Sequence, residues 1–351
     1  MTEIPGLDLP RLRAYLETNA PQLAGDLSAS LIPGGRSNLT YFVSNEITQY
    51  VLRRPPLGHV LTTAHDMGRE FRVMSALSES DVPVPKPLLL CEDESVIGAP
   101  FYLMSKVEGS VYRTKEETAS LTYVKAQELS ADLIEILARL HKIDPAKAGL
   151  GDFGKVEGFL ERQLGRWQKQ LASSNSRQIN GIGELAAGLS AAIPETKNSG
   201  IIHGDFRLDN CIINSDMKVA AVVDWEMSTL GDCLSDVGLF VVYWDGIPGH
   251  PESPISGGIS AERGFPSSVE LLERYAAITG FNLDRINWYV AFGFFKLAVI
   301  LEGIHFRYNK GQTVGTGFEE IGNWVDPLVA AGVDALNRGP NNSPGGIGKQ
   351  G

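Results

Sequence analysis

The sequence is poor in cysteine, and its three cysteines form neither a metal-binding nor a disulfide pattern. Cys91, Cys211 and Cys233 are scattered, odd in number, and never separated by only two residues. This spacing argues against a disulfide framework and a zinc site, and it favours a reducing compartment. The first residues also lack a basic segment followed by an apolar one. No secretory signal is therefore expected, and the cytoplasm is the predicted location.

The chain also has fewer basic than acidic residues. The chain has 31 Lys and Arg residues against 42 Asp and Glu, which gives a formal net charge of −11 over 351 residues. A chain of this charge cannot hold a nucleic-acid phosphate backbone by bulk electrostatics, so neither DNA nor RNA is expected as a partner. The charge would suit a cationic substrate, but it is also ordinary for a soluble enzyme.

Long uninterrupted apolar runs are also missing. The most apolar stretch, residues 291–304, is short and is interrupted by Lys296 and Glu302. A bilayer requires about 20 consecutive apolar residues, so this stretch predicts a buried helix, and no membrane partner is expected.

Hydrophobic spacing and turn residues predict a small β-rich lobe followed by a larger helical lobe. After a first helix, three strands at residues 29–32, 39–43 and 49–53 predict an antiparallel meander. A helix at 63–77 and strands at 87–90 and 100–104 complete the first lobe. Further helices are expected from residue 123 onward and at 156–171, 182–192, 268–278, 288–308 and 318–336. The expected division is a nucleotide-binding lobe at 1–104, a hinge at 105–109, a catalytic and substrate-binding lobe at 110–338 and a disordered tail at 339–351.

The clearest chemical signal is residues 203–210, with the sequence HGDFRLDN, between two apolar pairs. A second apolar strand, residues 219–223, leads to Asp224. Phosphoryl transfer needs positioning, charge neutralisation and a residue that orients the attacking hydroxyl. Asp205 can accept the hydroxyl proton, while Asn210 and Asp224 offer the oxygen ligands that Mg²⁺ prefers. Each residue alone could be an ordinary loop or strand-end residue, but their joint spacing favours a phosphotransferase.

This pattern resembles the aminoglycoside phosphotransferase/choline kinase branch of the protein-kinase-like superfamily, in the right order up to about residue 336. The resemblance implies a two-lobed protein-kinase-like fold of the α+β class, with a small antiparallel sheet in the N-lobe and a larger, mainly helical C-lobe. It implies Mg²⁺ and ATP or GTP, with Asp205 as the catalytic base and Asn210 and Asp224 as metal ligands. Arg207 is expected to contact the transferred phosphate, and His203 to orient the loop.

The turn after the first strand is the candidate phosphate-positioning loop. Gly34 and Gly35 would let backbone N–H groups approach the phosphates, and Ser37 and Asn38 are candidate contacts. A plain hairpin turn is the alternative. No Gly-Lys-Ser/Thr follows, so the loop is not a Walker A motif.

Three further positions are expected to bind the nucleotide. Arg53, at the end of the third strand, would grip the α- and β-phosphates and pair with Glu70, while Arg54 would point outward. Pro55 and Pro56 could distort this alternation, so Arg54 is the alternative cation. A solvated surface charge is the alternative for Glu70. Backbone groups near Ser105 and Val107 in the hinge would contact the purine.

Two departures from protein kinases favour a small-molecule hydroxyl as the acceptor. The residue before Asp205 is glycine, so a phosphorylated activation loop has no docking cation, and the segment after Asp224 is short. Asp232 and Asp236 are interpreted as helix-capping residues. The alternatives are a non-catalytic nucleotide-binding module, an aminoglycoside or macrolide resistance kinase, and a protein kinase.

The acceptor pocket has weaker signals. Its candidate residues, which could equally be core aromatics and surface charges, are Trp225, Glu226, Tyr243, Trp244 and Arg307. Segments 51–56 and 295–298 resemble the kinase-like domains fused to some acyl-CoA dehydrogenases and their stand-alone bacterial relatives. That likeness suggests a hydroxylated acyl acceptor, and it predicts nothing about the oligomeric state.

Overall fold

The computed structural model describes residues 4–32, 38–57, 66–174, 176–256, 259–312 and 317–338. The chain divides into two compact units: residues 1–110 with 211–228, and residues 111–210 with 229–351. The expected boundary placed residues 110–338 together. In the structure, residues 211–228 belong to the first unit, because Ser110 pairs with Ile213 and the Val222 N–H donates to the Pro83 carbonyl at 2.8 Å.

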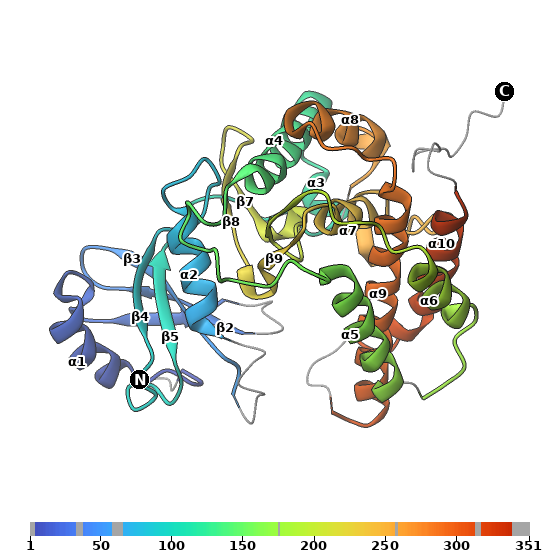
Figure 1. The fold of residues 1–351 in the computed structure, drawn as a ribbon. Coiled ribbons are helices and arrows are strands. Elements are labelled where there is room, and N and C mark those ends of the chain that lie inside the picture. The colour runs from blue at the N-terminus through green and yellow to red at the C-terminus, as the bar shows by residue number, and fades with distance from the viewer. Residues whose placement is uncertain are drawn as a thin grey trace. The chain divides into compact units, whose positions relative to one another are not determined.

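The first unit contains a five-stranded antiparallel sheet with the order β1-β2-β3-β5-β4 (Figure 1). Its first three strands form the meander expected from the sequence. The strands are β1 (Ser28–Leu31), β2 (Leu39–Ser44), β3 (Gln49–Arg54), β4 (Pro87–Cys91) and β5 (Phe101–Ser105). The same unit contains the hairpin of β7 (Cys211–Ile213) and β8 (Val219–Val222), followed by the 3₁₀ turn η3 (Trp225–Met227).

Two helices cover the two faces of this sheet, because strand side chains alternate between faces. Helix α1 (Leu9–Asn19), followed by the turn η1 (Pro21–Leu23), packs Leu12 and Leu16 into a core with Tyr41 and Leu52. Helix α2 (Met67–Leu77) lies on the other face, where the Phe71 ring meets Tyr102. The Asp66 side chain caps α2 by accepting the Arg69 N–H, and residues 63–65 of the expected helix lie outside the described residues.

The second unit is mainly helical. Strand β6 (Ser199–Ile202) pairs with β9 (Thr229–Asp232), and the turn η2 (Leu208–Asn210) follows the loop after β6. The α-helices are α3 (Lys115–Thr118), α4 (Tyr123–Lys142), α5 (Phe159–Ser174), α6 (Ile182–Ala191), α7 (Leu234–Asp245), α8 (Ser268–Thr279), α9 (Ile286–Asn309) and α10 (Val325–Asn337). Short 3₁₀ turns are η4 (Pro254–Ser256), η5 (Ala261–Arg263) and η6 (Ile321–Trp324). The small antiparallel sheet and the larger helical part confirm the expected α+β class.

Helix α9 is the central helix of the second unit and packs against α5, α6, α7 and α10 (Figure 1). It is longer than the apolar run in the sequence, and by length and composition alone it could cross a membrane. The expectation that this segment is too short is therefore corrected. Two thirds of its apolar window is buried by neighbouring helices, which is the environment of a core helix.

Candidate active site

The loop that carries Asp205 is held by buried polar groups of the second unit. The chain leaves β6 and turns at Gly204, whose φ of 85° is readily adopted only by glycine. The Asp236 carboxylate accepts the backbone N–H groups of His203 at 2.6 Å and Gly204 at 2.8 Å. His203 is fully buried, and its Nδ1 accepts the Asp205 N–H at 3.2 Å. The backbone on the N-terminal side of Asp205 is therefore fixed.

Asp236 has a different role from the helix cap expected from the sequence. It lies inside the first turn of α7, where it is almost completely buried, and it accepts hydrogen bonds from the Asp205 loop. The Asp236 carboxylate also contacts Nε2 of His141 in α4, at 3.4 Å. Burial alone would raise the pKa of Asp236, but its hydrogen bond with His141 and the charges of the two histidines lower it. Asp232, by contrast, accepts the Leu234 N–H at the start of α7.

Both carboxylate oxygens of Asp205 have a partner. The Tyr243 hydroxyl donates to Oδ1 at 2.6 Å, and Nδ2 of Asn210 donates to Oδ2 at 3.1 Å. Burial, followed by the nearby Asp205 charge, raises the pKa of Tyr243 well above its usual value. The phenol therefore stays protonated and acts as a donor that orients the carboxylate.

The Asn210 side chain is turned in a way that suits a metal ligand. Its Nδ2 also donates to the Asp205 carbonyl at 2.9 Å, so the amide nitrogen faces the loop. Within the described part of the chain, the Asn210 Oδ1 accepts no hydrogen bond. This oxygen remains available to a hard cation such as Mg²⁺.

Arg207 already has an acidic partner. Its guanidinium forms a two-pronged ion pair with Asp209 and lies over the Tyr243 ring, 4.5 Å from the centroid. Burial would lower the pKa of Arg207, but Asp209 and the neighbouring groups outweigh it and raise the pKa. The contact with a transferred phosphate expected from the sequence would therefore compete with Asp209.

Lys296 of α9 is a residue of this region that the sequence did not indicate as part of the site. Its ammonium donates to the Gly204 carbonyl at 2.6 Å, next to Asp205 along the chain. Burial lowers the pKa of Lys296, while the Asp205 and Asp236 charges act in the opposite direction. In the sequence, Lys296 interrupted an apolar helix and belonged to segment 295–298, but neither signal placed it beside Asp205.

In the first unit, Arg53 is the centre of an acidic cluster. Its Nε lies 3.0 Å from Oε2 of Glu70 in α2, although this N–H does not point at the oxygen closely enough for a hydrogen bond. Its Nη2 lies 2.5 Å from Oδ1 of Asp224 and 3.7 Å from Glu226. Burial would lower the pKa of Arg53, but these carboxylates, with Glu70 first among them, raise it. Burial raises the pKa of Glu70 despite the nearby Arg53.

Arg54 is not the solvent-facing residue expected from the sequence. It is 4% exposed, and its guanidinium donates to the carbonyls of Gly6 and Ile97 on the opposite face of the sheet. The N-terminal segment covers this face, which leaves Arg53 alone to meet Glu70 and Asp224.

Asp224 has an unusual backbone conformation for a residue with a side chain. Its φ of 68° and ψ of 57° lie in the left-handed region, which Asp adopts more readily than most residues. This turn follows β8 and leads into η3. In η3, the Glu226 carboxylate accepts a hydrogen bond from Nδ2 of Asn38 at 2.9 Å. The second carboxylate oxygen of Asp224, Oδ2, accepts no hydrogen bond from any described residue.

The remaining expected nucleotide contacts are only partly described. Gly34, Gly35 and Ser37 lie outside the described residues. The Ser105 N–H donates to the Lys86 carbonyl at 2.8 Å, so this group is already used. Val107 follows β5, and among the described residues its backbone forms no hydrogen bond outside the strand ladders. A purine contact in this segment therefore falls more readily on Val107 than on Ser105.

Two of the expected acceptor residues are core residues. The Trp225 indole N–H donates to the Val222 carbonyl at 2.9 Å, and that of Trp244 donates to Pro266 at 2.8 Å. Both side chains are at most 4% exposed. Glu226 belongs to the Arg53 cluster, Arg307 is exposed on α9, and Tyr243 contacts Asp205.

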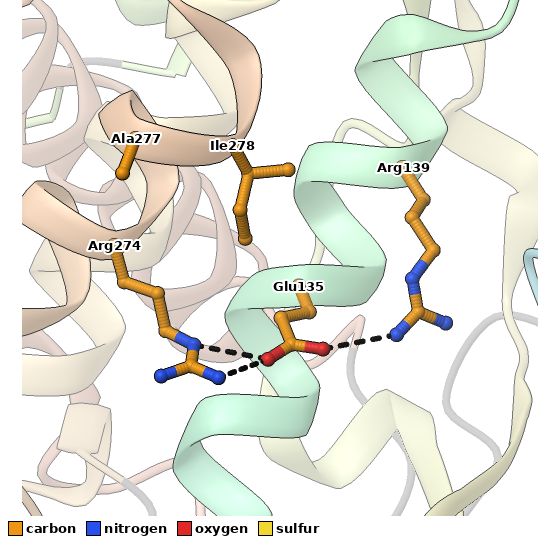
Figure 2. Close-up of a pocket in the computed structure, with 5 residues that line it drawn as sticks. All are labelled: Glu135, Arg139, Arg274, Ala277 and Ile278. Atoms are coloured by element: carbon orange, nitrogen blue, oxygen red, sulfur yellow. Dashed lines mark hydrogen bonds and ion pairs between the residues drawn. The ribbon is translucent and has the colours of Figure 1, made fainter.

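The second unit also has a pocket between α4 and α8, and none of the expected acceptor residues lines it. Figure 2 shows Glu135 between two arginines, with Arg274 contacting one carboxylate oxygen and Arg139 contacting the other at 3.1 Å. The pocket has a volume of about 270 Å³, slightly below the usual range of small-molecule sites. This shared ion pair links two helices and offers no catalytic group.

Comparison with known proteins identifies related chains. The model of a family described as the phosphotransferase enzyme family matches residues 28–288. Acyl-CoA dehydrogenase family member 11 from Rattus norvegicus is 34% identical over 342 residues, which cover 94% of this chain but 43% of the rat protein. The chain thus spans less than half the length of this relative, in agreement with the resemblance to kinase-like domains fused to acyl-CoA dehydrogenases.

Solved structures confirm the kinase-like fold expected from the sequence. A crystal structure from Ralstonia eutropha, named among the aminoglycoside phosphotransferases, is 32% identical with a TM-score of 0.82, and the match covers 94% of this chain and 98% of that one. A thermostable aminoglycoside phosphotransferase in complex with ADP and hygromycin B is 15% identical with a TM-score of 0.58, covering 92% and 98% of the two chains. The second likeness concerns the fold alone.

Proposed function

This chain belongs to the phosphotransferase enzyme family, and we propose that it transfers the γ-phosphate of ATP or GTP to a hydroxyl group of a small molecule. The observation that carries this proposal is the Asp205 carboxylate, which is held on one oxygen by Tyr243 and on the other by Asn210. A carboxylate fixed in this way, on a loop whose backbone is also held, suits a base that orients an attacking hydroxyl.

In the proposed reaction, the acceptor hydroxyl donates to Asp205 while its oxygen attacks the γ-phosphorus in line with the leaving diphosphate oxygen. The proton passes to the Asp205 carboxylate as the new oxygen–phosphorus bond forms. The Tyr243 hydroxyl and the Asn210 amide keep the carboxylate in one orientation, so no reorientation is required when the acceptor binds.

The donor set of this chain suits Mg²⁺. The Asn210 Oδ1 and the Asp224 Oδ2 are hard oxygen atoms, and neither accepts a hydrogen bond from the described residues. We propose these two residues as the Mg²⁺ ligands. A bound Mg²⁺ would neutralise charge on the β- and γ-phosphates.

Arg53 is the proposed cation for the nucleotide phosphates. Its contacts with Glu70 and Asp224 hold the guanidinium in a fixed position, and arginine can bind two phosphate oxygens at once. The backbone of Val107 is the proposed purine contact. Gly34, Gly35, Ser37 and Asn38 remain proposed phosphate contacts, although Asn38 also donates to Glu226.

The acceptor is proposed to be a hydroxylated acyl compound, supported by the similarity to acyl-CoA dehydrogenase family member 11. The likeness to aminoglycoside phosphotransferases is the basis of the second candidate, an antibiotic kinase. A non-catalytic module would not need the orientation of Asp205, and a protein kinase is disfavoured by the short segment after Asp224. The cytoplasm is the proposed location.

The proposal is tested with a metabolite library, offered with ATP and with GTP in the presence of Mg²⁺, and read by the mass of the phosphorylated product. The Asp205→Asn variant should lose transfer while it still binds nucleotide. Asp216→Asn changes an exposed residue of the β7–β8 hairpin and is the matched control. Normal transfer by Asp205→Asn would refute the role given to Asp205, and nucleotide binding without transfer to any compound would favour the non-catalytic module.

A further inference from the structure

Next to the Asp205 loop lies a cation without an acidic partner. The Lys296 ammonium donates one hydrogen bond, to the Gly204 carbonyl at 2.6 Å. An ammonium has three donors, so this contact leaves two unused. Among the described residues, no carboxylate lies within ion-pair distance of Lys296. The side chain is also partly buried, which makes a charge without a close partner costly, and the charges of Asp205 and Asp236 offset part of this cost.

A second cation lies against the same aromatic residue. The Lys296 ammonium is 5.7 Å from the centroid of the Trp167 ring, and the Arg166 guanidinium is 5.6 Å from it. Arg166 also forms no ion pair with any residue that the structure describes. Burial and, to a smaller extent, the charge of Arg166 lower the pKa of Lys296, while the charges of Asp205 and Asp236 act in the opposite direction.

Two partly buried arginines of the second unit have acidic partners, whereas Arg166 is exposed. Arg207 forms an ion pair with Asp209, and Arg177 forms one with Glu302 at 2.9 Å. Lys296 and Arg166 thus both lie against Trp167 without a close carboxylate partner among the described residues, and both can donate to a further anionic group. An anion would relieve both the desolvation of Lys296 and its repulsion from Arg166.

We infer that Lys296 and Arg166 bind an anionic group of the acceptor, a carboxylate or a phosphate, while its hydroxyl meets Asp205. This inference rests on the proposed function, and it narrows the acceptor to hydroxyl compounds that carry a negative charge. Polycationic acceptors, which the net charge of the whole chain would suit, are disfavoured here because they would face two cations.

A purely structural role for Lys296 makes a different prediction. If the ammonium only held the Gly204 carbonyl, its loss would slow transfer to charged and neutral acceptors equally. If it also binds the acceptor, its loss should abolish the preference for anions and raise the acceptor KM. The charge preference therefore separates the two roles.

The experiment uses hydroxycarboxylic acids of increasing chain length, their neutral amides and the amino alcohols of the same lengths. Glycerol phosphate paired with glycerol distinguishes a phosphate from a carboxylate. Binding is measured by titration calorimetry on the wild-type chain, and transfer by product mass. We expect at least one anion to bind about tenfold or more tighter than its neutral counterpart, as for a charge-assisted hydrogen bond.

The variants are Lys296→Met, Arg166→Met and the conservative Lys296→Arg. The two methionine variants should each reduce the preference for anions by about tenfold, while Lys296→Arg retains most of it. Lys169→Met, an exposed residue one turn further along α5, is the matched control and should behave as wild type.

The outcomes separate this inference from the proposed function. If no anionic compound binds better than its neutral counterpart, or if the preference survives in the double Lys296→Met/Arg166→Met variant, the inference is wrong. Transfer to neutral or cationic acceptors alone would refute it while leaving the phosphotransferase intact. Anion binding that depends on Lys296, without transfer to any compound, would support the anion site and count against the proposed function.

Discussion

The Tyr243 hydroxyl lies 2.6 Å from a carboxylate oxygen of Asp205, 38 residues earlier in the chain. Seven positions before Tyr243, on the same side of α7, Asp236 accepts the backbone N–H groups of His203 and Gly204. One face of one helix therefore holds both the backbone of this loop and the side chain of its proposed base.

The Tyr243→Phe variant should test the hydrogen bond that the Tyr243 hydroxyl donates to the Asp205 side chain. Loss of a hydrogen bond to a charged group costs about 1.5–3 kcal/mol, so transfer should fall by about tenfold or more while nucleotide binding is retained. Steady-state kinetics with an acceptor from the library measure this. Tyr289→Phe removes a hydroxyl that instead donates to Asp232, and it should have a smaller effect on transfer. Equal effects would show that Tyr243 is only a packing residue.

The Asp236→Asn variant should test how Asp236 holds the backbone of the Asp205 loop, through the pH dependence of the protein's stability. The pKa of Asp236 is lowered in the folded protein, so its carboxylate stabilises the fold above its unfolded pKa of about 3.9, and this stabilisation is lost as pH falls through the folded value. The facing groups are His141, His203 and Lys296.

Urea unfolding of the Asp236→Asn variant between neutral and acidic pH should therefore show a deficit that is largest near neutrality and narrows below about pH 4. Asp334→Asn, an exposed residue of α10, should follow the wild-type curve. A deficit that stays constant with pH would contradict a stabilising charge at Asp236.

Arg53 and Glu70 should behave as a coupled buried pair. The Glu70 side chain is almost completely buried, so Arg53→Met leaves its charge without its close partner. Removing one member of such a pair costs about 3–5 kcal/mol, whereas replacing both with apolar residues costs much less. Chemical denaturation should therefore find Arg53→Met less stable than the double Arg53→Met/Glu70→Leu variant. Additive losses would argue against the coupling.

Gly238 should tolerate no side chain, because α7 crosses α9 at this position. A Cβ placed on Gly238 would lie 2.4 Å from the carbonyl carbon of Tyr289, which is backbone and cannot move cheaply. We expect Gly238→Ala to lower the free energy of unfolding by about 1–3 kcal/mol or more. Gly183→Ala in α6 meets nothing within 4 Å and should instead stabilise the protein by up to about 1 kcal/mol. Thermal denaturation of both variants measures the difference.

The strands of the first unit could be predicted because their signals are local. Alternating apolar residues and the turns at Pro33 and Ser44 define β1, β2 and β3 without reference to distant parts of the chain. Helix α7 gave no such signal, since residues such as Val237, Phe240 and Val242 are buried on all sides and leave no polar face. A period cannot be read from a helix that is apolar all round.

The roles of single polar residues depended on contacts that sequence spacing does not contain. Asp236 lies near the start of a helix, which is typical of a capping residue, yet its partners come from the loop after β6 and from α4. Arg54 alternates outward from the sheet, but the segment around Gly6 covers that face. The spacing predicted roles for Asp205 and Asn210, and Tyr243 was a candidate acceptor residue. The contact of Tyr243 with Asp205 and that of Lys296 with the loop depend on the packing of α7 and α9.

The late position of residues 211–228 in the sequence delays the completion of the first unit during synthesis. The first unit begins at the N-terminus, but the strands that pair with Ser110 and Pro83 leave the ribosome only after a hundred residues of the second unit. At about 5–20 residues per second, the nascent sheet must wait several seconds or more for the β7–β8 hairpin. A fragment ending near residue 110 should therefore be an incomplete folding unit, and one that extends to residue 228 should contain every segment of the first.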